Sequence, residues 1–276
     1  MSAWILLRGL TRESGHWSHL PEYLRAAGIE GDIAFADLPG SGRHVLDRAP
    51  LEVGRTTDFV RARLAATGPV APYRLIALSL GAMVAVDWAQ RFPEEIEALV
   101  LINTSMRRYS GPLERLRPAA WPAIVHIARR WGTRSTEGST SVSASALVER
   151  RNVETIIHAL TCARIDTRDM DLAAWTEIFE RASPTRANAL RQLCAAARFR
   201  GAPIAPHCPT LLLASRADAL VHPACSAKIA AAWGVAIGEH PWAGHDLAHD
   251  DPVWLAETIA AWVGNALAVA APPASA

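Results

Sequence analysis

The chain has 276 residues, half of them hydrophobic, and its 28 basic side chains balance 27 acidic ones. This length can bury the core of one large domain or of a domain with an insertion, and the balanced charge excludes a general attraction to nucleic acid or membranes. Lys228 is the only lysine, which excludes a P-loop, and its alanine-rich surroundings indicate a solvated helix residue rather than a catalytic one.

The four cysteines show neither a Cys-x-x-Cys spacing nor a nearby histidine pair of the zinc-finger type. They are Cys162, Cys194, Cys208 and Cys225, and we expect them to be reduced and mostly buried, with no metal site and no cofactor. The apolar run at residues 4–7 is too short for a signal peptide, and no uncharged stretch reaches the length of a membrane span. The sequence therefore predicts a cytoplasmic protein without membrane or nucleic-acid partners, and it leaves the oligomeric state open.

Apolar strands and amphipathic helices alternate over the first 105 residues. Strands are predicted at residues 4–7, 33–36, 74–78 and 98–102, and helices at residues 17–27, 56–66 and 80–91. This alternation predicts a parallel sheet with right-handed crossovers. The Gly40-x-Gly42 sequence lacks the third glycine of a dinucleotide-binding loop, so we expect a tight turn there.

The strand pattern disappears between residues 106 and 205 and then returns. Helices are predicted at residues 119–131, 146–165, 172–181 and 184–199, with a mobile Ser/Thr/Gly-rich connector at residues 132–145. Strands then follow at 210–214 and 236–240, helices at 224–233 and 252–267, and a frayed tail at 268–276. The sequence thus predicts an α/β core of residues 1–105 and 206–267, with a helical insertion of residues 106–205 between two strands.

Ser79 lies on the predicted turn between the strand at residues 74–78 and the helix at residues 80–91. Ala77 and Gly81 give the pattern small-x-Ser-x-small, a relaxed form of the Gly-x-Ser-x-Gly nucleophile elbow. Small residues allow strand and helix to approach closely, and the helix N-terminus places unpaired N–H groups beneath the hydroxyl. Taken alone, this stretch is equally consistent with a tight turn that carries a helix-capping serine.

Ligands of parallel α/β sheets lie beyond the carboxyl ends of the strands, so the residues that follow each strand are candidate site residues. Ser79, Asp218 and His245 follow three different predicted strands, in this order along the chain. Three other histidines compete with His245, but none follows a glycine on the loop after the last strand: His222, His240 and His249. Asp246 is too close in sequence to His245 to orient it, which leaves Asp218 as the best acid.

The order Ser79, Asp218, His245 resembles that of the α/β-hydrolases, and the resemblance covers nearly the whole chain. Four further blocks are similar to family motifs: the Arg8-Gly9 turn, residues 37–44, residues 214–218 and Gly244-His245. The resemblance is to the capped serine esterases, and it implies an α/β-hydrolase fold whose helical cap is the insertion. Four positions depart from the pattern, namely Arg8 and Leu78, where histidine is common, His44, where serine is usual, and Ala77, where glycine is usual.

A serine hydroxyl is a poor nucleophile at neutral pH and needs a base within hydrogen-bond reach. His245 is expected to take the proton of Ser79, and Asp218 to hold the imidazole tautomer and stabilise its charged form. The backbone N–H groups of Leu10 and Leu80 are expected to form the oxyanion hole, each contributing about 3 kcal/mol.

Apolar faces of the insertion are expected either to line an acyl pocket or to form the core of the cap. The expected substrate is an ester with a small or medium apolar acyl group. Residues expected to contact it are Arg8, Trp17, Trp121 and Trp175. Arg8 has two interpretations, a structural packing role or a cation placed near a substrate carboxylate.

The segment from Arg107 to Arg151 is strongly basic. Solvated helix faces are the simpler explanation. By resemblance to the pimeloyl-carrier methyl esterases, the alternative is a docking surface for an acidic acyl carrier protein. Charge reversal at Arg107, Arg108, Arg129 and Arg130 would distinguish the two.

Three hypotheses of function remain open on the sequence. The first is hydrolysis of a carboxylic ester through an acyl-enzyme. The second keeps the triad for acyl transfer, perhydrolysis, C–C bond hydrolysis or lyase chemistry. The third is a non-catalytic binding module on the same fold, against which all three triad positions carry the required side chains.

Overall fold

The computed structural model of the protein describes residues 2–131 and 144–270. Six parallel strands form one sheet in the order β2-β1-β3-β4-β5-β6. The strands are β1 (Ala3–Leu7), β2 (Ile33–Phe35), β3 (Tyr73–Leu78), β4 (Ile96–Ile102), β5 (Thr210–Ser215) and β6 (Ala236–His240). The predicted α/β class with a parallel sheet is confirmed.

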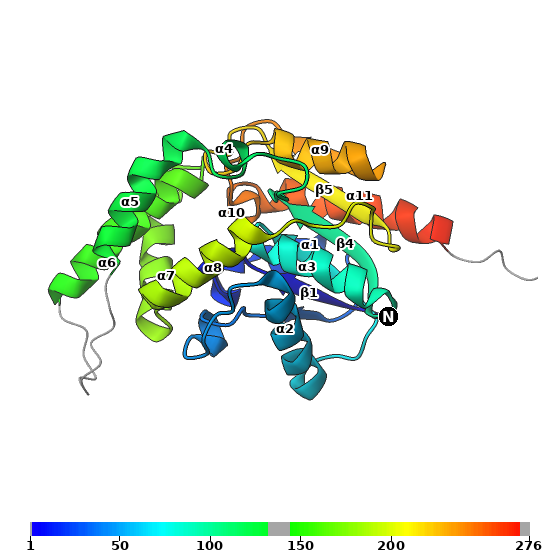
Figure 1. The fold of residues 1–276 in the computed structure, drawn as a ribbon, viewed down its shortest axis with the longest axis horizontal. Helices are drawn as coiled ribbons and strands as arrows, with labels where there is room; N and C mark the ends of the chain where they lie inside the picture. The colour runs from blue at the N-terminus through cyan, green and yellow to red at the C-terminus, as the bar shows by residue number, and fades with distance from the viewer. Residues whose placement is uncertain (1, 132–143, 271–276) are drawn as a thin grey trace, which may run out of the picture.

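Helices cover both faces of the sheet (Figure 1). The side chains of α2 (Val53–Thr67), α3 (Leu80–Arg91) and α9 (Ala224–Trp233) pack in one hydrophobic cluster with alternate strand residues such as Leu75 and Leu101. Those of α1 (Leu20–Ala26) and α11 (Pro252–Ala270) pack on the other face with the remaining strand residues. Because both faces are buried, the strands are continuous apolar runs, which is why the sequence pattern identified them.

The described residues between β4 and β5 form five α-helices, and those from α5 to α8 gather on one side of the molecule in Figure 1. These insertion helices are α4 (Pro112–Arg115), α5 (Trp121–Arg130), α6 (Ala144–Thr161), α7 (Arg168–Arg181) and α8 (Arg186–Arg198). The helical insertion between two strands is thus present, whereas the division into domains at residues 105 and 206 stays a prediction. No helix in the described ranges combines the length and hydropathy that crossing a membrane requires.

Several element boundaries differ from the predictions. The helix predicted from residue 17 begins at Leu20, because Ser14–Trp17 forms a 3-10 turn and Ser18 has a positive φ of 48°. The helix predicted to reach residue 165 ends at Thr161, because the N–H groups of Ala163 and Arg164 bond to the Asp250 carboxylate instead of to helix carbonyls.

The short helices α4 and α10 (Leu247–Asp250) were not predicted, and α2 begins three residues earlier than expected. The last helix continues to Ala270, so residues 268–270 are helical rather than part of a tail. The predicted mobile connector falls largely on residues 132–143, which lie outside the described residues, as do residues 271–276 of the predicted tail.

Candidate active site

Ser79 occupies a strained turn between β3 and α3. Its φ of 57° and ψ of −114° are rare for a residue with a side chain, and its N–H bonds the Ile102 carbonyl at 2.9 Å. A Cβ atom at Gly81 would lie 2.5 Å from the Leu7 carbonyl oxygen, so only glycine lets α3 approach β1 this closely. The strain and the close approach are the features that a nucleophile elbow requires.

The loop after β1 passes directly beside this serine. A Cβ at Gly9 would lie 3.1 Å from Ser79 Cβ, and Leu10 and Leu80 line the same cavity as Ser79. Leu80 is the first residue of α3, so its N–H has no partner within the helix. The backbone hydrogen bonds of the described residues likewise include none from the Leu10 N–H. Both donors are available near Ser79, and their role as the oxyanion hole stays a prediction.

His245 and Asp218 form a buried pair. His245 Nδ1 lies 2.7 Å from Asp218 Oδ2, and Asp218 is only 1% exposed. The other carboxylate oxygen of Asp218 accepts the N–H groups of Leu220 and Val221 at 2.8 and 2.9 Å, which fixes its orientation. Because a carboxylate can only accept, Nδ1 must carry the proton, and this leaves Nε2 as the basic atom.

Two opposing effects set the pKa of His245. Burial lowers it, but the charge of Asp218 and the hydrogen bond to its carboxylate outweigh burial and raise the pKa above its ordinary value. Ser79 and His245 line one cavity, although the contacts within the described residues include no hydrogen bond between the Ser79 hydroxyl and the His245 ring. Such bonds often tighten only once substrate is bound.

Asn103, directly after β4, holds the loop that carries His245 (residues 241–246, the histidine loop) to the sheet. Its Nδ2 donates to the carbonyls of His245 at 2.8 Å and Gly244 at 3.3 Å, and its Oδ1 accepts the Ser215 N–H at 2.8 Å. Asn103 is 2% exposed and has a positive φ of 47°. Asn103 was not among the predicted site residues. Its place directly after a central strand was the available signal.

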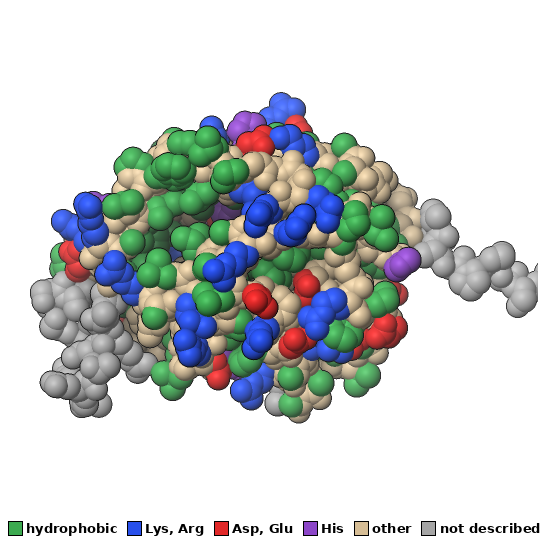
Figure 2. Space-filling model, viewed as in Figure 1, with side chains coloured by type: hydrophobic (Ala, Val, Ile, Leu, Met, Phe, Trp, Pro, Cys, Tyr) green, Lys and Arg blue, Asp and Glu red, His purple; other side chains and the backbone are tan. Residues whose placement is uncertain are grey.

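A cavity of about 410 Å³ opens at Ser79 and extends under the insertion helices. Figure 2 shows hydrophobic side chains bordering a hollow on this side of the molecule. Most of its lining side chains are apolar, and those from the insertion include Leu116, Trp121, Ile124, Ile127, Trp131 and Leu160. Volume and lining are typical of a site for a small molecule.

The predicted substrate contacts divide into two groups. Arg8 and Trp121 line the cavity, whereas Trp17 and Trp175 do not. Trp17 is buried in the core beneath the Arg8 guanidinium, 4.8 Å from it. Trp175, on α7, packs against the ring of His158 on α6 and that of His249 on α10. Both tryptophans therefore pack against other side chains instead of facing the cavity. A large apolar ring buried in this way fits their spacing in the sequence as well as a substrate contact does.

Arg8 is paired with a protein carboxylate. Its guanidinium forms a bidentate ion pair with Asp246, with Arg8 Nη1 2.9 Å from Oδ1, and both side chains are at most 5% exposed. This supports the structural interpretation of Arg8 over the substrate-carboxylate interpretation. Asp246, which was considered in the sequence only as a partner for His245, is thus the partner of Arg8.

One family model and several solved structures of known proteins are similar to this chain. The family model described as serine aminopeptidase, S33, matches residues 2–251. No curated protein matches the chain. Solved structures with the same fold include an esterase from Thermogutta terrifontis, at 19% identity and TM-score 0.65 over 96% of this chain and 90% of that one.

Two further structures are similar. One is the enol-lactonase from Burkholderia xenovorans LB400, at 17% identity and TM-score 0.68 over 97% of this chain and 91% of that one. The other is a thioesterase from the prodiginine biosynthetic pathway of Streptomyces coelicolor, at 19% identity and TM-score 0.59 over 95% and 84%. Likeness at these identities shows a shared fold.

Proposed function

The chain belongs to the serine aminopeptidase S33 family of α/β-hydrolases, and from this premise we propose that it cleaves a carboxylic ester through an acyl-enzyme on Ser79. One observation carries the proposal. A strained serine at a nucleophile elbow shares a mostly apolar cavity with a histidine whose other ring nitrogen is held by a buried carboxylate.

The chemistry takes two steps. His245 Nε2 accepts the Ser79 proton as the hydroxyl oxygen attacks the ester carbonyl, and the free N–H groups near Ser79 stabilise the oxyanion. His245 then returns the proton to the alcohol that leaves, and the acyl group stays on Ser79. In the second step His245 activates a water molecule, which releases the acid and restores the serine.

The cavity favours an ester of a small or medium apolar acid. Its apolar walls would hold the acyl chain by burying it, and the polar groups around Ser79 would orient the carbonyl. The similar esterase, lactonase and thioesterase structures support attack on an acyl carbon, and they leave the leaving group open.

The family description favours a second candidate, removal of an N-terminal residue from a peptide. An aminopeptidase needs an anionic group to pair with the substrate's ammonium group. The one acidic residue that lines the described cavity is Asp246, and Arg8 already neutralises it. The charge of this cavity therefore supports ester hydrolysis over aminopeptidase activity.

Burst kinetics on p-nitrophenyl esters of increasing chain length test the proposal. We expect a burst of p-nitrophenol and fluorophosphonate labelling in the wild type, both lost in Ser79→Ala, with an optimum at short or medium chains. Ser105→Ala, at a second serine on the cavity wall, should keep both signals. A folded wild type that neither labels nor turns over esters would overturn the proposal, and turnover of aminoacyl-p-nitroanilides instead would favour the second candidate.

We propose separately that an acidic acyl carrier protein delivers the acyl group. Arg107, Arg108 and Arg129 are exposed on the insertion segment, and Arg130 is exposed although paired with Glu149 at 3.3 Å. Reversing the charge of these four arginines should raise KM for carrier-linked esters and leave free esters unaffected. Equal turnover of carrier-linked esters by the variant would refute this docking role.

A further inference from the structure

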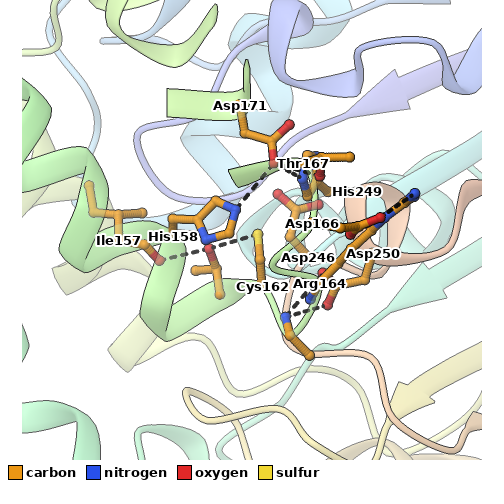
Figure 3. A network of polar contacts seen from close by, with 12 residues as sticks. Ile157, His158, Cys162, Arg164, Asp166, Thr167, Asp171, Asp246, His249 and Asp250 are labelled. Atoms are coloured by element: carbon orange, nitrogen blue, oxygen red, sulfur yellow. Dashed lines mark hydrogen bonds and ion pairs between the residues drawn. The ribbon is translucent and has the colours of Figure 1, made fainter. Parts of the chain in front are cut away.

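Two histidines and a cysteine meet where the insertion contacts the histidine loop (Figure 3). His158 and Cys162 are one turn apart on α6, and His249 lies on α10, just after His245. One ring nitrogen of each histidine and the Cys162 sulfur all lie within 4.8 Å of one another. His158 is 2% exposed and Cys162 9%, so two donors are buried and the third, His249, is half-buried.

Asp171 on α7 orients both imidazole rings. Its Oδ2 lies 3.3 Å from His158 Nε2 and 2.9 Å from His249 Nε2, and it also accepts the Thr167 hydroxyl at 2.8 Å. Because a carboxylate only accepts, each Nε2 carries the proton and each Nδ1 keeps a free lone pair. A carboxylate that fixes ring tautomers in this way is the usual second partner of metal-ligating histidines.

The sulfur of Cys162 keeps its lone pairs available for a ligand. It lies 3.6 Å from the Thr161 hydroxyl, and because that hydroxyl donates to the Ile157 carbonyl at 2.8 Å, the thiol is the donor in this contact. Trp175 packs against both rings, with centroids 5.4 Å from His158 and 5.5 Å from His249, and closes one side with apolar surface. The cluster thus concentrates soft donors behind an apolar wall.

Cys162 would bind a metal ion as a thiolate, because a bound metal ion deprotonates its coordinating thiol outright.

We propose that His158, Cys162 and His249 bind a transition-metal ion of the zinc class. Two imidazoles and one thiolate suit zinc and cobalt, whereas magnesium and calcium prefer oxygen ligands. Binding replaces the Cys162 proton by the metal ion and releases that proton to solvent, with no change of oxidation state.

The ion would join the insertion to the core. Its ligands come from α6 on one side and α10 on the other, and α10 follows the loop that carries His245. Three protein ligands leave the fourth position of a tetrahedral ion to a water molecule, and the site does not depend on which bond the enzyme cleaves.

Cobalt titration of the reduced, chelator-treated full-length chain tests the site. We expect one equivalent of Co²⁺ to bind with a thiolate-to-cobalt charge-transfer absorption and the intense visible bands of tetrahedral cobalt, and Zn²⁺ to displace it. Cys162→Ser should lose the charge-transfer absorption, whereas Cys194→Ser on α8 should keep it.

Affinity and stability give independent measurements. His249→Gln and Asp171→Asn should weaken binding about tenfold or more, and the exposed His126→Gln should not. Zn²⁺ should raise the Tm of the wild type and not that of Cys162→Ser. The proposal is overturned if the wild type binds no tight equivalent of Co²⁺, or if the thiolate absorption persists in Cys162→Ser. The wild-type titration decides even if a variant does not fold.

Discussion

At the scale of single residues, Asn103 has the most specific positioning role. Asn103→Ala would leave the His245 and Gly244 carbonyls and the Ser215 N–H without this buried partner. Each unsatisfied group costs about 1–3 kcal/mol, so we expect a lower free energy of unfolding in urea and a lower kcat with a smaller change in KM. Asn265→Ala is the control, because Asn265 is exposed and bonds only within its own helix. Equal effects of the two variants would contradict this role.

His245 should govern the acidic side of the pH profile. Catalysis needs its neutral form, and its pKa is raised, so kcat/KM should increase with pH through a value above the ordinary pKa of about 6.5. Asp218→Asn removes the charge that raises the pKa. The acidic limb should then move to lower pH, and kcat should fall by about 10³-fold or more because the tautomer is no longer held.

The raised pKa of His245 also affects folding. Activity should increase as pH rises, whereas the contribution of His245 to the free energy of unfolding should decrease. A histidine whose pKa is raised by folding contributes its full stabilisation below its unfolded pKa and loses it as pH rises through its folded pKa. The wild type should therefore lose stability relative to Asp218→Asn between neutral and mildly alkaline pH. An acidic limb that does not move in Asp218→Asn would mean that another group sets the profile.

The positions of Ser79, Asp218 and His245 could be predicted, because each lies within five residues of the carboxyl end of a strand of a parallel sheet, and that sheet edge brings such residues together. Asn103 follows the same rule, but a neutral amide is not one of the side chains that a serine, histidine and aspartate triad requires, so it was not predicted. The partner of Arg8 could not be predicted, since Asp246 is remote in sequence and only the folded chain places the two together. His158 and Cys162 carry a one-turn helical spacing that a search for zinc-finger spacings does not detect.

At the scale of elements, the contact between α3 and β1 depends on Gly81. In Gly81→Ala the new Cβ would lie 2.5 and 2.6 Å from the carbonyl oxygens of Leu7 and Arg8, which are backbone atoms and cannot rotate away. We expect a loss of about 1–3 kcal/mol in the free energy of unfolding and reduced acylation, because Ser79 must shift with the helix. Thermal unfolding and burst amplitude measure the two effects.

Gly264→Ala is the matched control for that prediction. Gly264 lies in α11 with no atom within 4 Å of an added Cβ, so alanine should stabilise the helix by about 0.5–1 kcal/mol. If Gly81→Ala were as stable and as active as Gly264→Ala, the close approach of α3 to β1 would not be a requirement of the site.

The strands could be predicted because parallel strands that are buried on both faces have continuous runs of apolar residues in the sequence. Helix ends were less predictable. Ser18 has a positive φ and separates α1 from the preceding 3-10 turn. Neither feature produces a periodic pattern in the sequence, so the sequence could not show where α1 begins. The four-residue helices α4 and α10 are shorter than two turns, so their hydrophobic spacing cannot be distinguished from that of a loop.

At the scale of the whole molecule, hydrogen bonds of backbone N–H groups join the insertion to the histidine loop. No local sequence pattern predicts these bonds. The Asp246 N–H donates to the Thr161 carbonyl at 2.7 Å, at the end of α6. The Asp250 carboxylate accepts from Gly244 on one side and from Ala163 and Arg164 on the other. The sequence predicted an insertion above the site, but such side-chain-to-backbone contacts between distant segments depend on the folded arrangement.

Asp250 is therefore expected to couple the stability of the insertion to catalysis. Asp250→Ala removes the acceptor of three backbone N–H groups, of which that of Gly244 is buried, and we expect a loss of about 1–3 kcal/mol in the free energy of unfolding. Because Gly244 precedes His245, kcat for a p-nitrophenyl ester should fall as well. Urea unfolding and steady-state kinetics measure both quantities.

Asp166→Ala is the control that separates this coupling from a general effect of removing a carboxylate near α6. Asp166 is exposed, and its side chain pairs with Arg164 in the same loop, so its loss should leave both the free energy of unfolding and kcat close to the wild-type values. If Asp250→Ala lost stability but kept wild-type kcat, the insertion would hold to the core without positioning His245. If kcat fell with unchanged stability, Asp250 would act on the histidine loop alone, and the coupling would be disproved.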